Sequence, residues 1–184
     1  KNKMKKAALH NLGCKVNAYE TEAMQHLLEE AGYEIVPFTQ KADVYVINTC
    51  SVTNMADRKS RQMLHKAKKN NPDSIVVATG CYVQTSEKEV LNDLSVDIVI
   101  GNDRKHDLVR LLEEYSLDSV NDTVDDINDG KHDFEELFID QTKEHTRAFI
   151  KVQDGCNQFC SYCIIPYARG RVRSRRFENV IAEV

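Results

Sequence analysis

The sequence predicts an α/β protein built on an open parallel β-sheet with helices on both faces. Two observations support this fold class. Short apolar runs rich in β-branched residues alternate with longer segments that carry apolar residues at helical spacing. Each run leads through a turn into a helix, an order that implies right-handed crossovers and parallel strands. With 184 residues, 41% of them hydrophobic, the chain has enough apolar material for one sound core and part of a second domain.

The first predicted unit is a strand, a turn and a helix. The apolar run at residues 6–12 ends at a Gly-Cys turn. A helix is expected at residues 18–32, because alanines and leucines recur there at helical spacing and Gly32 supplies a stop. Residues 33–38 read as an additional short or edge strand.

The same unit then repeats along the chain. The expected strands are 43–49, 74–80 and 96–101, and the expected helices are 55–71, a shorter one from about Ser86, and 103–115. Together these elements predict a flavodoxin-like open sheet over about residues 4–115.

Charge and turn signals divide the chain into three parts. We expect a first domain at residues 1–115, an acidic linker at 116–145, and the start of a second domain at 146–184. Residues 113–140 carry eleven Asp or Glu against one Lys, although the FEELF segment within them is able to pack locally. The second domain is expected to begin with a strand at 146–153.

The ends and composition of the chain lead to further expectations. No run approaches the length of a membrane span and no secretory leader is visible, so we expect a cytoplasmic protein without membrane contact, with Met4 as a plausible original start. The last residues, 177–184, read as the first turns of a helix, so the chain is expected to be a piece of a longer protein.

Three cysteines lie within eight positions, at residues 156, 160 and 163. This spacing is short enough for three sulfurs to reach one metal centre; the alternative is a group of buried or reactive thiols. A structural zinc site normally has four protein ligands, and no Cys or His follows within twenty residues. A [4Fe-4S] cluster held by Cys156, Cys160 and Cys163 would keep one iron open for a small molecule, and this interpretation is favoured.

The other three cysteines each follow a different predicted strand. Because the carboxyl ends of parallel strands share one edge of a sheet, Cys14, Cys50 and Cys81 are expected in one cleft. Each precedes a helix whose N-terminal dipole favours the thiolate. In a reducing compartment, ligation is a better interpretation than disulfides, and the remaining alternative is three small core residues.

The segments around the cysteines resemble those of a known family. GCNQFCSYCIIPYARGRVRSR (155–175) is similar to the cluster signature of radical S-adenosylmethionine methylthiotransferases. LGCKVNAYETEA (12–23), VINTCSVT (46–53) and TGCYVQ (79–84) resemble the three cysteine motifs of the amino-terminal domain of that family. The resemblance covers the chain apart from the acidic linker, and it accounts for all six cysteines.

The resemblance implies a transferase with two [4Fe-4S] clusters as cofactors. The cluster at Cys156, Cys160 and Cys163 would be catalytic, binding S-adenosylmethionine and generating a 5′-deoxyadenosyl radical. The other cluster, held by the first three cysteines, would carry the sulfur that is methylated and transferred. Tyr162 matches the position of an aromatic residue near the bound adenine; the alternative is an ordinary loop tyrosine. The implied partners are an electron donor such as flavodoxin or ferredoxin, and a sulfur donor.

The same resemblance implies that the second domain is the first strand and cluster loop of a radical-SAM β/α barrel. Much of the S-adenosylmethionine pocket would then lie beyond residue 184, so these residues alone are expected to have little or no turnover.

The expected substrate is tRNA that bears N6-threonylcarbamoyladenosine next to the anticodon, and the product is its 2-methylthio derivative. GCKVN, with Lys15, resembles the threonylcarbamoyladenosine branch, whereas the isopentenyladenosine branch tends to carry Gln-Met there. The alternatives are methylthiolation of isopentenyladenosine in tRNA or of a ribosomal-protein aspartate. An alternative of a different class is a non-catalytic iron–sulfur electron-transfer module.

Two groups of cations are candidates for contacts with tRNA phosphates. One is the run of five arginines in residues 169–176, and the other lies on the predicted helix 55–71. The alternative for both is a solvated face. The helix cations are Arg58, Lys59, Arg61, Lys66, Lys68 and Lys69.

Overall fold

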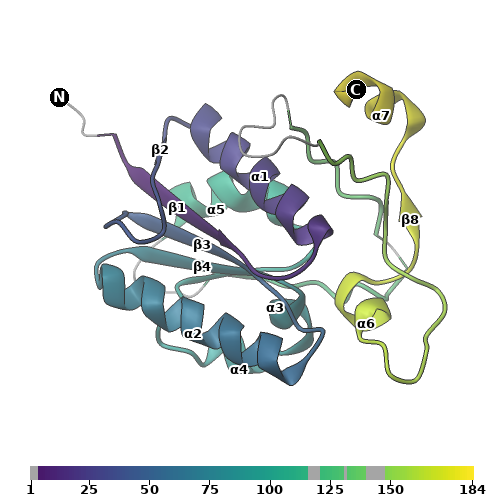
Figure 1. Cartoon of the computed structure of the whole chain (residues 1–184), viewed down its shortest axis with the longest axis horizontal. Helices are drawn as coiled ribbons and strands as arrows, with labels where there is room; N and C mark the ends of the chain where they lie inside the picture. Colours follow the sequence, from purple (N-terminus) through teal and green to yellow (C-terminus); the bar gives the residue numbers. More distant parts are fainter. Residues whose placement is uncertain (1–3, 116–120, 131, 140–147) are drawn as a thin grey trace.

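The computed structural model describes residues 4–115, 121–130, 132–139 and 148–184. Within these residues the central sheet has six parallel strands in the order β2-β1-β3-β4-β5-β6 (Figure 1). The open flavodoxin-like sheet is confirmed, including the short edge strand β2. The strands are β1 (Lys6–Asn11), β2 (Glu34–Ile35), β3 (Val44–Thr49), β4 (Ile75–Gly80), β5 (Ile98–Ile100) and β6 (Asn121–Thr123).

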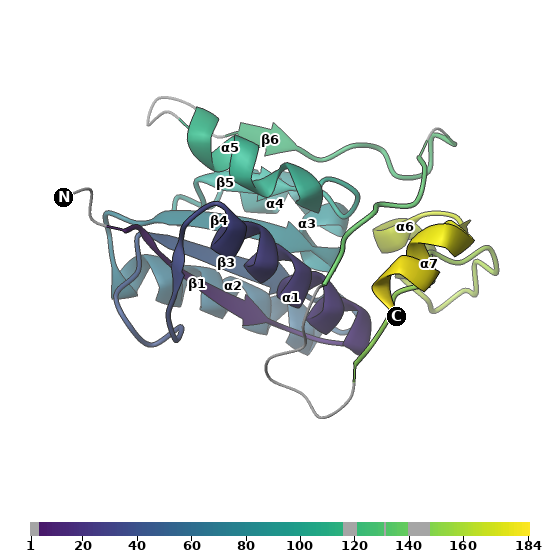
Figure 2. The same ribbon diagram turned by 90° about the horizontal axis from the view of Figure 1, so that it is seen from above.

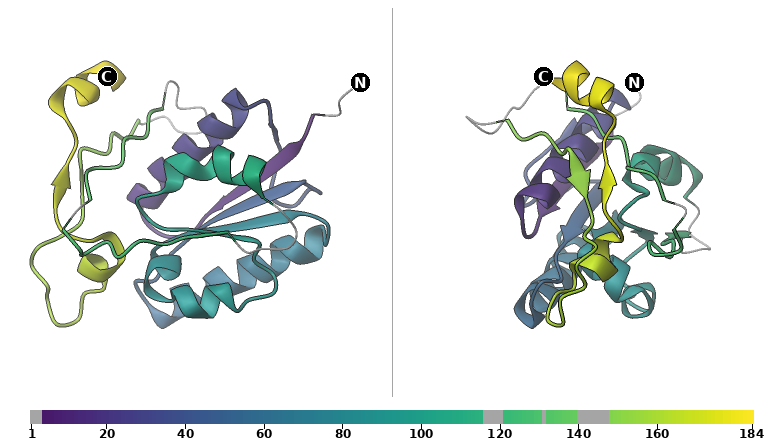
Figure 3. Two further views of the ribbon diagram at one scale, coloured as in Figure 1. Left: turned by 180° about the vertical axis from the view of Figure 1, so that it is seen from behind. Right: turned by 90° about the vertical axis from the view of Figure 1, so that its right-hand side faces the viewer.

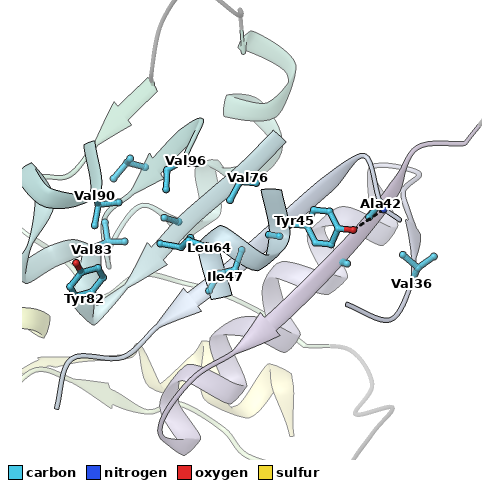
Figure 4. Close-up of a cluster of buried hydrophobic side chains, with 14 residues drawn as sticks. Val36, Ala42, Tyr45, Ile47, Leu64, Val76, Tyr82, Val83, Val90 and Val96 are labelled. Carbon is cyan, nitrogen blue, oxygen red and sulfur yellow. Dashed lines mark hydrogen bonds between the residues drawn. The ribbon is translucent and has the colours of Figure 1, made fainter. Parts of the chain in front are cut away.

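Helices cover both faces of the sheet, because alternate side chains of each strand point to opposite faces. On β3, Tyr45 and Ile47 point into the core cluster beneath α2 (Asn54–Asn70) (Figure 4). This cluster also includes residues of α4 (Glu87–Leu91). Val44 and Val46 enter the cluster on the other face, beneath the remaining long helices. Those helices are α1 (Lys15–Glu30) and α5 (Leu108–Glu114), the latter preceded by a short 3₁₀ turn, η1 (Lys105–Asp107).

The carboxy-terminal residues 148–184 lie at one end of this sheet, as Figures 2 and 3 show. They contain the short helices α6 (Ile165–Arg169) and α7 (Phe177–Glu183). The strand expected at 146–153 is reduced to β7 (Gln153–Asp154), which pairs antiparallel with β8 (Arg173–Ser174); residues 146–147 lie outside the described part. A strand needs a neighbour to satisfy its backbone groups, and among the described residues the only one that β7 pairs with is β8.

The acidic segment does more than connect the two parts. Its residues 121–123 form β6, the outer strand next to β5. Leu137 is buried against Tyr19 and Ala23 of α1, and the Tyr19 hydroxyl donates a hydrogen bond to the Leu137 carbonyl oxygen at 2.7 Å. Local packing of FEELF is therefore confirmed at Leu137. Residues 116–120, 131 and 140–147 of the expected linker lie outside the described residues.

None of the helices in the described ranges has both the length and the apolar character that crossing a membrane requires.

Candidate functional site

The first three cysteines lie at the carboxyl edge of the sheet, as the strand pattern predicts. Cys14 is the N-cap residue of α1, Cys50 directly follows β3, and Cys81 opens the short helix α3 (Cys81–Thr85) after β4. Because β1, β3 and β4 are adjacent and parallel, these positions share one edge. Cys50 and Cys81 are buried, whereas Cys14 is exposed.

Two glycines allow the backbone to approach closely at this edge. Gly80 has φ +99°, and a Cβ there would lie 2.4 Å from the Thr49 carbonyl oxygen, so glycine lets β4 run directly into the helix that begins at Cys81. Gly13 has φ +109°, and a Cβ would lie 2.8 Å from the Cys50 Sγ atom. The turn that carries Cys14 therefore touches the neighbouring cysteine.

Replacement of Gly13 by alanine is expected to destabilise the fold by about 1–3 kcal/mol, because it combines a strained φ with a clash against the Cys50 sulfur. Gly32→Ala is the matched control: Gly32 has φ +86°, but nothing lies within 4 Å of the point that a Cβ would occupy there. Urea unfolding of both variants separates the two effects. Equal losses of stability would show that the contact with Cys50 contributes nothing.

The expectation that each cysteine begins a helix holds at Cys14 and Cys81 but not at Cys50. Cys50 is separated from α2 by the N-cap Thr53, whose hydroxyl oxygen accepts a hydrogen bond from the Ala56 N–H. Burial raises the pKa of the Cys81 thiol, although the nearby Arg169 guanidinium acts in the opposite direction. The sequence does not reveal this burial, because Asn102, whose amide lies 3.8 Å from the Cys81 sulfur, and helix α6, which packs against α3, come from other parts of the chain.

The second cysteine set lies in a loop whose base is closed by β7 and β8. The Cys156 N–H donates to the Gly170 carbonyl oxygen at 3.0 Å, and the Cys163 N–H donates to the Cys160 carbonyl oxygen at 3.0 Å. Cys160 is exposed, while Cys156 and Cys163 are partly exposed. Tyr162 is 91% exposed, so it is available to a ligand rather than part of a core.

Helix α6, at the end of this loop, packs against α3 at the other cysteine set. Asn102 connects the two: its Nδ2 donates to the Ala168 carbonyl oxygen at 2.5 Å and lies 3.8 Å from the Cys81 Sγ atom. Asn128 also donates to the Pro166 carbonyl oxygen. The fold thus brings the loop of the second set to the sheet edge that carries the first.

The donor chemistry at both places fits an iron–sulfur cluster, because each place supplies three free thiols. Among the described residues, however, no three His, Cys, Asp or Glu side chains already converge as a metal site. The assignment of all six cysteines as ligands therefore stays a prediction.

A buried ion network joins the two parts of the chain beside these cysteines. Arg169 Nη1 lies 2.9 Å from Glu20 Oε1 and 3.1 Å from Asp154 Oδ2. Lys151 Nζ lies 2.7 Å from Glu20 and 2.6 Å from Asp154, and the fully buried Lys105 lies 3.4 Å from Glu20. Three cations and two carboxylates are thus buried together, and each has at least one partner of opposite charge.

The same guanidinium also reaches the turn that carries Cys14. Arg169 Nη2 donates to the Asn17 Oδ1 atom at 2.6 Å, and Asn17 in turn donates to the carbonyl oxygens of Leu12 and Thr49. The Cys14 sulfur lies 3.8 Å from the same Asn17 oxygen. Arg169 is therefore a positioning residue. Through Asn17 it links α6 to the backbone at Leu12 and Thr49, which lie just before Cys14 and Cys50.

Sequence reasoning missed this network, although a signal was present. Asn17 and Glu20 lie seven and four residues before Met24, on the helix face that packs against the sheet. Polar residues on a buried helix face require partners. Arg169, the cation that contacts both residues, is about 150 positions away, and no local pattern identifies it.

Acid is expected to weaken the fold through Glu20. Burial alone raises the pKa of this carboxyl, but Arg169, Lys105 and Lys151 outweigh burial and hold the pKa well below its usual value of 4.5. Its stabilising effect is complete above pH 4.5 and is lost as the pH falls through the lower folded-state pKa. In urea unfolding from pH 7 to pH 3, the difference in stability between the native chain and Glu20→Gln should narrow below pH 4.5. A difference that stays constant would contradict the network.

The arginine run is only partly available for phosphates, which corrects one expectation. Arg169 and Arg175 are buried, the latter with Glu136 and Glu183 as partners. Arg173 donates to the Arg169 carbonyl oxygen at 2.8 Å. Acids neutralise the two buried members, Glu20 and Asp154 at Arg169 and Glu136 and Glu183 at Arg175, whereas Arg171 and Arg176 are exposed.

Known proteins resemble this chain over nearly its whole length. A profile of the family described as "Uncharacterized protein family UPF0004" matches residues 6–101, which hold the first three cysteines. The threonylcarbamoyladenosine tRNA methylthiotransferase MtaB of Bacillus subtilis (strain 168) is 47% identical over 182 residues, which are 98% of this chain and 40% of that relative. The protein of the same name from Aquifex aeolicus (strain VF5) is 44% identical over 181 residues, 97% of this chain and 44% of the relative.

A relative named for a different substrate also matches. The ribosomal protein uS12 methylthiotransferase RimO of Dictyoglomus thermophilum is 34% identical over 185 residues, 98% of this chain and 41% of that relative. The chain thus spans about two fifths of the length of these curated relatives. These matches confirm the resemblance to the methylthiotransferases, and the chain belongs to uncharacterized protein family UPF0004.

Proposed function

We propose that this chain is the cluster-binding part of a radical S-adenosylmethionine methylthiotransferase that acts on N6-threonylcarbamoyladenosine in tRNA. The observation that carries the proposal is the packing of α6 on α3, which brings the Cys156–Cys163 loop to the sheet edge that holds Cys14, Cys50 and Cys81. A reaction that joins a carbon radical to a sulfur donor needs its two cofactor sites within reach of one substrate.

The proposed division of the chain is a cluster-binding sheet domain at 1–115, an acidic connection at 116–145 and the start of a barrel at 146–184. Cys156, Cys160 and Cys163 would hold one [4Fe-4S] cluster, and Cys14, Cys50 and Cys81 the other. When bound, the first supplies an electron for cleavage of S-adenosylmethionine and the second carries the sulfur to be transferred.

The residues of this chain have the task of holding these sites in place. The closed base of the loop and the hydrogen bond from Cys156 to Gly170 fix where the second set begins. Asn17, held by Arg169, fixes the backbone at Leu12 and Thr49, next to two of the other cysteines. The exposed Tyr162 ring is free to stack on an adenine.

The substrate assignment rests on identity and on motif. Relatives named for threonylcarbamoyladenosine tRNA reach 47% identity, against 34% for the relative named for uS12. Nucleoside mass spectrometry tests it: cells lacking the gene for the whole protein should lose 2-methylthio-N6-threonylcarbamoyladenosine and regain it on complementation. If the cells instead lose the methylthio group of isopentenyladenosine, or that of a ribosomal-protein aspartate, then that group is the substrate of the protein.

Iron and sulfide analysis tests the cluster assignment directly. After anaerobic reconstitution, the chain should hold about eight iron and eight sulfide ions, and a variant with Ala at positions 156, 160 and 163 about four. If the native chain holds about four iron ions and the variant none, then Cys14, Cys50 and Cys81 are structural thiols in this chain. If the whole protein binds both clusters but fails to cleave S-adenosylmethionine, it is an electron-transfer module and not a methylthiotransferase.

A further inference from the structure

Helix α2 has one buried face and one strongly basic face. Ser60, Leu64 and Ala67 are buried against the sheet at helical spacing, and Leu64 and Ala67 belong to the core. Six Lys or Arg and a single acid, Asp57, lie within the helix. Packing accounts for the first face and leaves the charge of the second unexplained.

The cations of α2 fall into two groups. Arg61 donates to the Tyr82 hydroxyl at 3.1 Å, and Lys68 pairs with Asp97 at 2.8 Å, so these two serve the fold on the flanks of the helix. The other four are exposed, and within the described residues none of them forms a salt bridge. We call this group the outer basic face; it consists of Arg58, Lys59, Lys66 and Lys69.

Together with Gln62, three members of the outer basic face form a line of hydrogen-bond donors along the helix. Arg58, Gln62, Lys66 and Lys69 follow one another at intervals of three or four residues, which places about one donor on each 5.4 Å turn of the helix. Arg, Lys and Gln side chains are those that contact phosphate oxygens in nucleic-acid complexes. Four neighbouring cations without a salt-bridge partner repel one another, and an anionic ligand relieves that repulsion.

The position of this face relates it to the candidate site. α2 begins four residues after Cys50 and runs from the cysteine-bearing edge along the sheet (Figure 1). Val52 and Met55, at its start, are 58% and 61% exposed. An RNA chain that places one nucleotide at the cysteines can therefore continue along the outer basic face.

We propose that the outer basic face of α2 binds the phosphate backbone of the substrate tRNA, outside the modified nucleotide itself. This inference rests on the proposed function, because it takes the partner to be tRNA. The face contacts phosphates only, so it contributes affinity and orientation for any tRNA sequence and no choice between modified bases.

Binding of tRNA to the chain at several salt concentrations tests the proposal. A variant with Arg58→Gln, Lys66→Gln and Lys69→Gln should bind at least about tenfold more weakly near 0.1 M salt, and its slope of log association constant against log salt should fall by about 2 to 3. The control removes the same charge elsewhere, at Lys5, Lys41 and Arg110, which are exposed. The control should retain most of the affinity and slope.

Three outcomes would overturn the proposal. One is an outer-face variant that binds tRNA as the native chain does while Arg171→Gln with Arg176→Gln abolishes binding; methylthiolation of tRNA would then stand without this surface. Another is binding to vesicles of anionic phospholipid that depends on the outer face while tRNA binding does not. The third is no tRNA binding by the native chain at any salt concentration. The nucleoside analysis of the whole protein tests the proposed function separately, so the two proposals can fail independently.

Discussion

Replacement of Glu20 by alanine is expected to lower the free energy of unfolding by about 3–5 kcal/mol, the range for breaking a buried ion pair. Glu20 is fully buried and contacts Arg169, Lys151 and Lys105. Without it, three buried cations are left with Asp154 as the only acid of the network. Because a domain of this size has about 5–15 kcal/mol of stability, the loss is a large part of the total.

Urea unfolding monitored by circular dichroism measures this effect, with Glu30→Ala as the control. Glu30 lies on the same helix but is exposed, and its contact with His26 is 3.6 Å long. Surface ion pairs contribute about 0–1 kcal/mol, so the control should differ little from the native chain. If the two alanine variants lose similar stability, the buried network does not exist in solution.

Replacement of Arg169 by methionine is expected to be the second largest effect, at about 3 kcal/mol. The loss is smaller than for Glu20 because the remaining charges, two lysines against Glu20 and Asp154, balance. Methionine fills part of the volume but donates no hydrogen bonds, so Asn17 loses its 2.6 Å contact. The consequence reaches further than stability, since this contact ties α6 to the turn that carries Cys14.

Limited proteolysis separates the two consequences. In Arg169→Met, cleavage within residues 156–170 should accelerate under conditions in which the sheet domain remains folded by circular dichroism. Arg169→Lys keeps the charge but loses the planar fork, so it should restore stability only in part. Arg176→Met is the control, because Arg176 is exposed. Unchanged cleavage in Arg169→Met would mean that α6 is held at the sheet by other contacts alone.

Much of the fold could be predicted because its signals are local. The strands that follow one another as β-branched runs, and the helices with apolar residues at helical spacing, were placed to within a few residues. The errors lie where tertiary contacts override the pattern. In place of the predicted strand 146–153, the structure has only Gln153–Asp154, which pairs with the equally short β8. Part of the acidic linker forms β6 because its backbone pairs with the edge of β5.

The placement of the cysteines was predictable for a related reason. Parallel strands end at a common edge, so residues that follow β1, β3 and β4 meet there whatever their distance in sequence. Their burial was not predictable. Cys81 opens α3, and α6, which packs against α3, comes more than eighty residues later and carries no pattern that indicates its docking position.

The sequence by itself determined the parallel sheet, the edge at which Cys14, Cys50 and Cys81 lie, and the short spacing of the second cysteine set. Local periodicity and short loops are sufficient for each of these. Only the tertiary structure decided which cations are structural and which are free. Arg169 and Arg175 look like surface charges in the sequence but are neutralised by acids that folding brings to them, among them Glu20 and Glu136 from other segments. The cations on the outer basic face of α2 form no salt bridge among the described residues. A charge acquires its role from the partners that folding brings to it, and those partners are not written beside it in the chain.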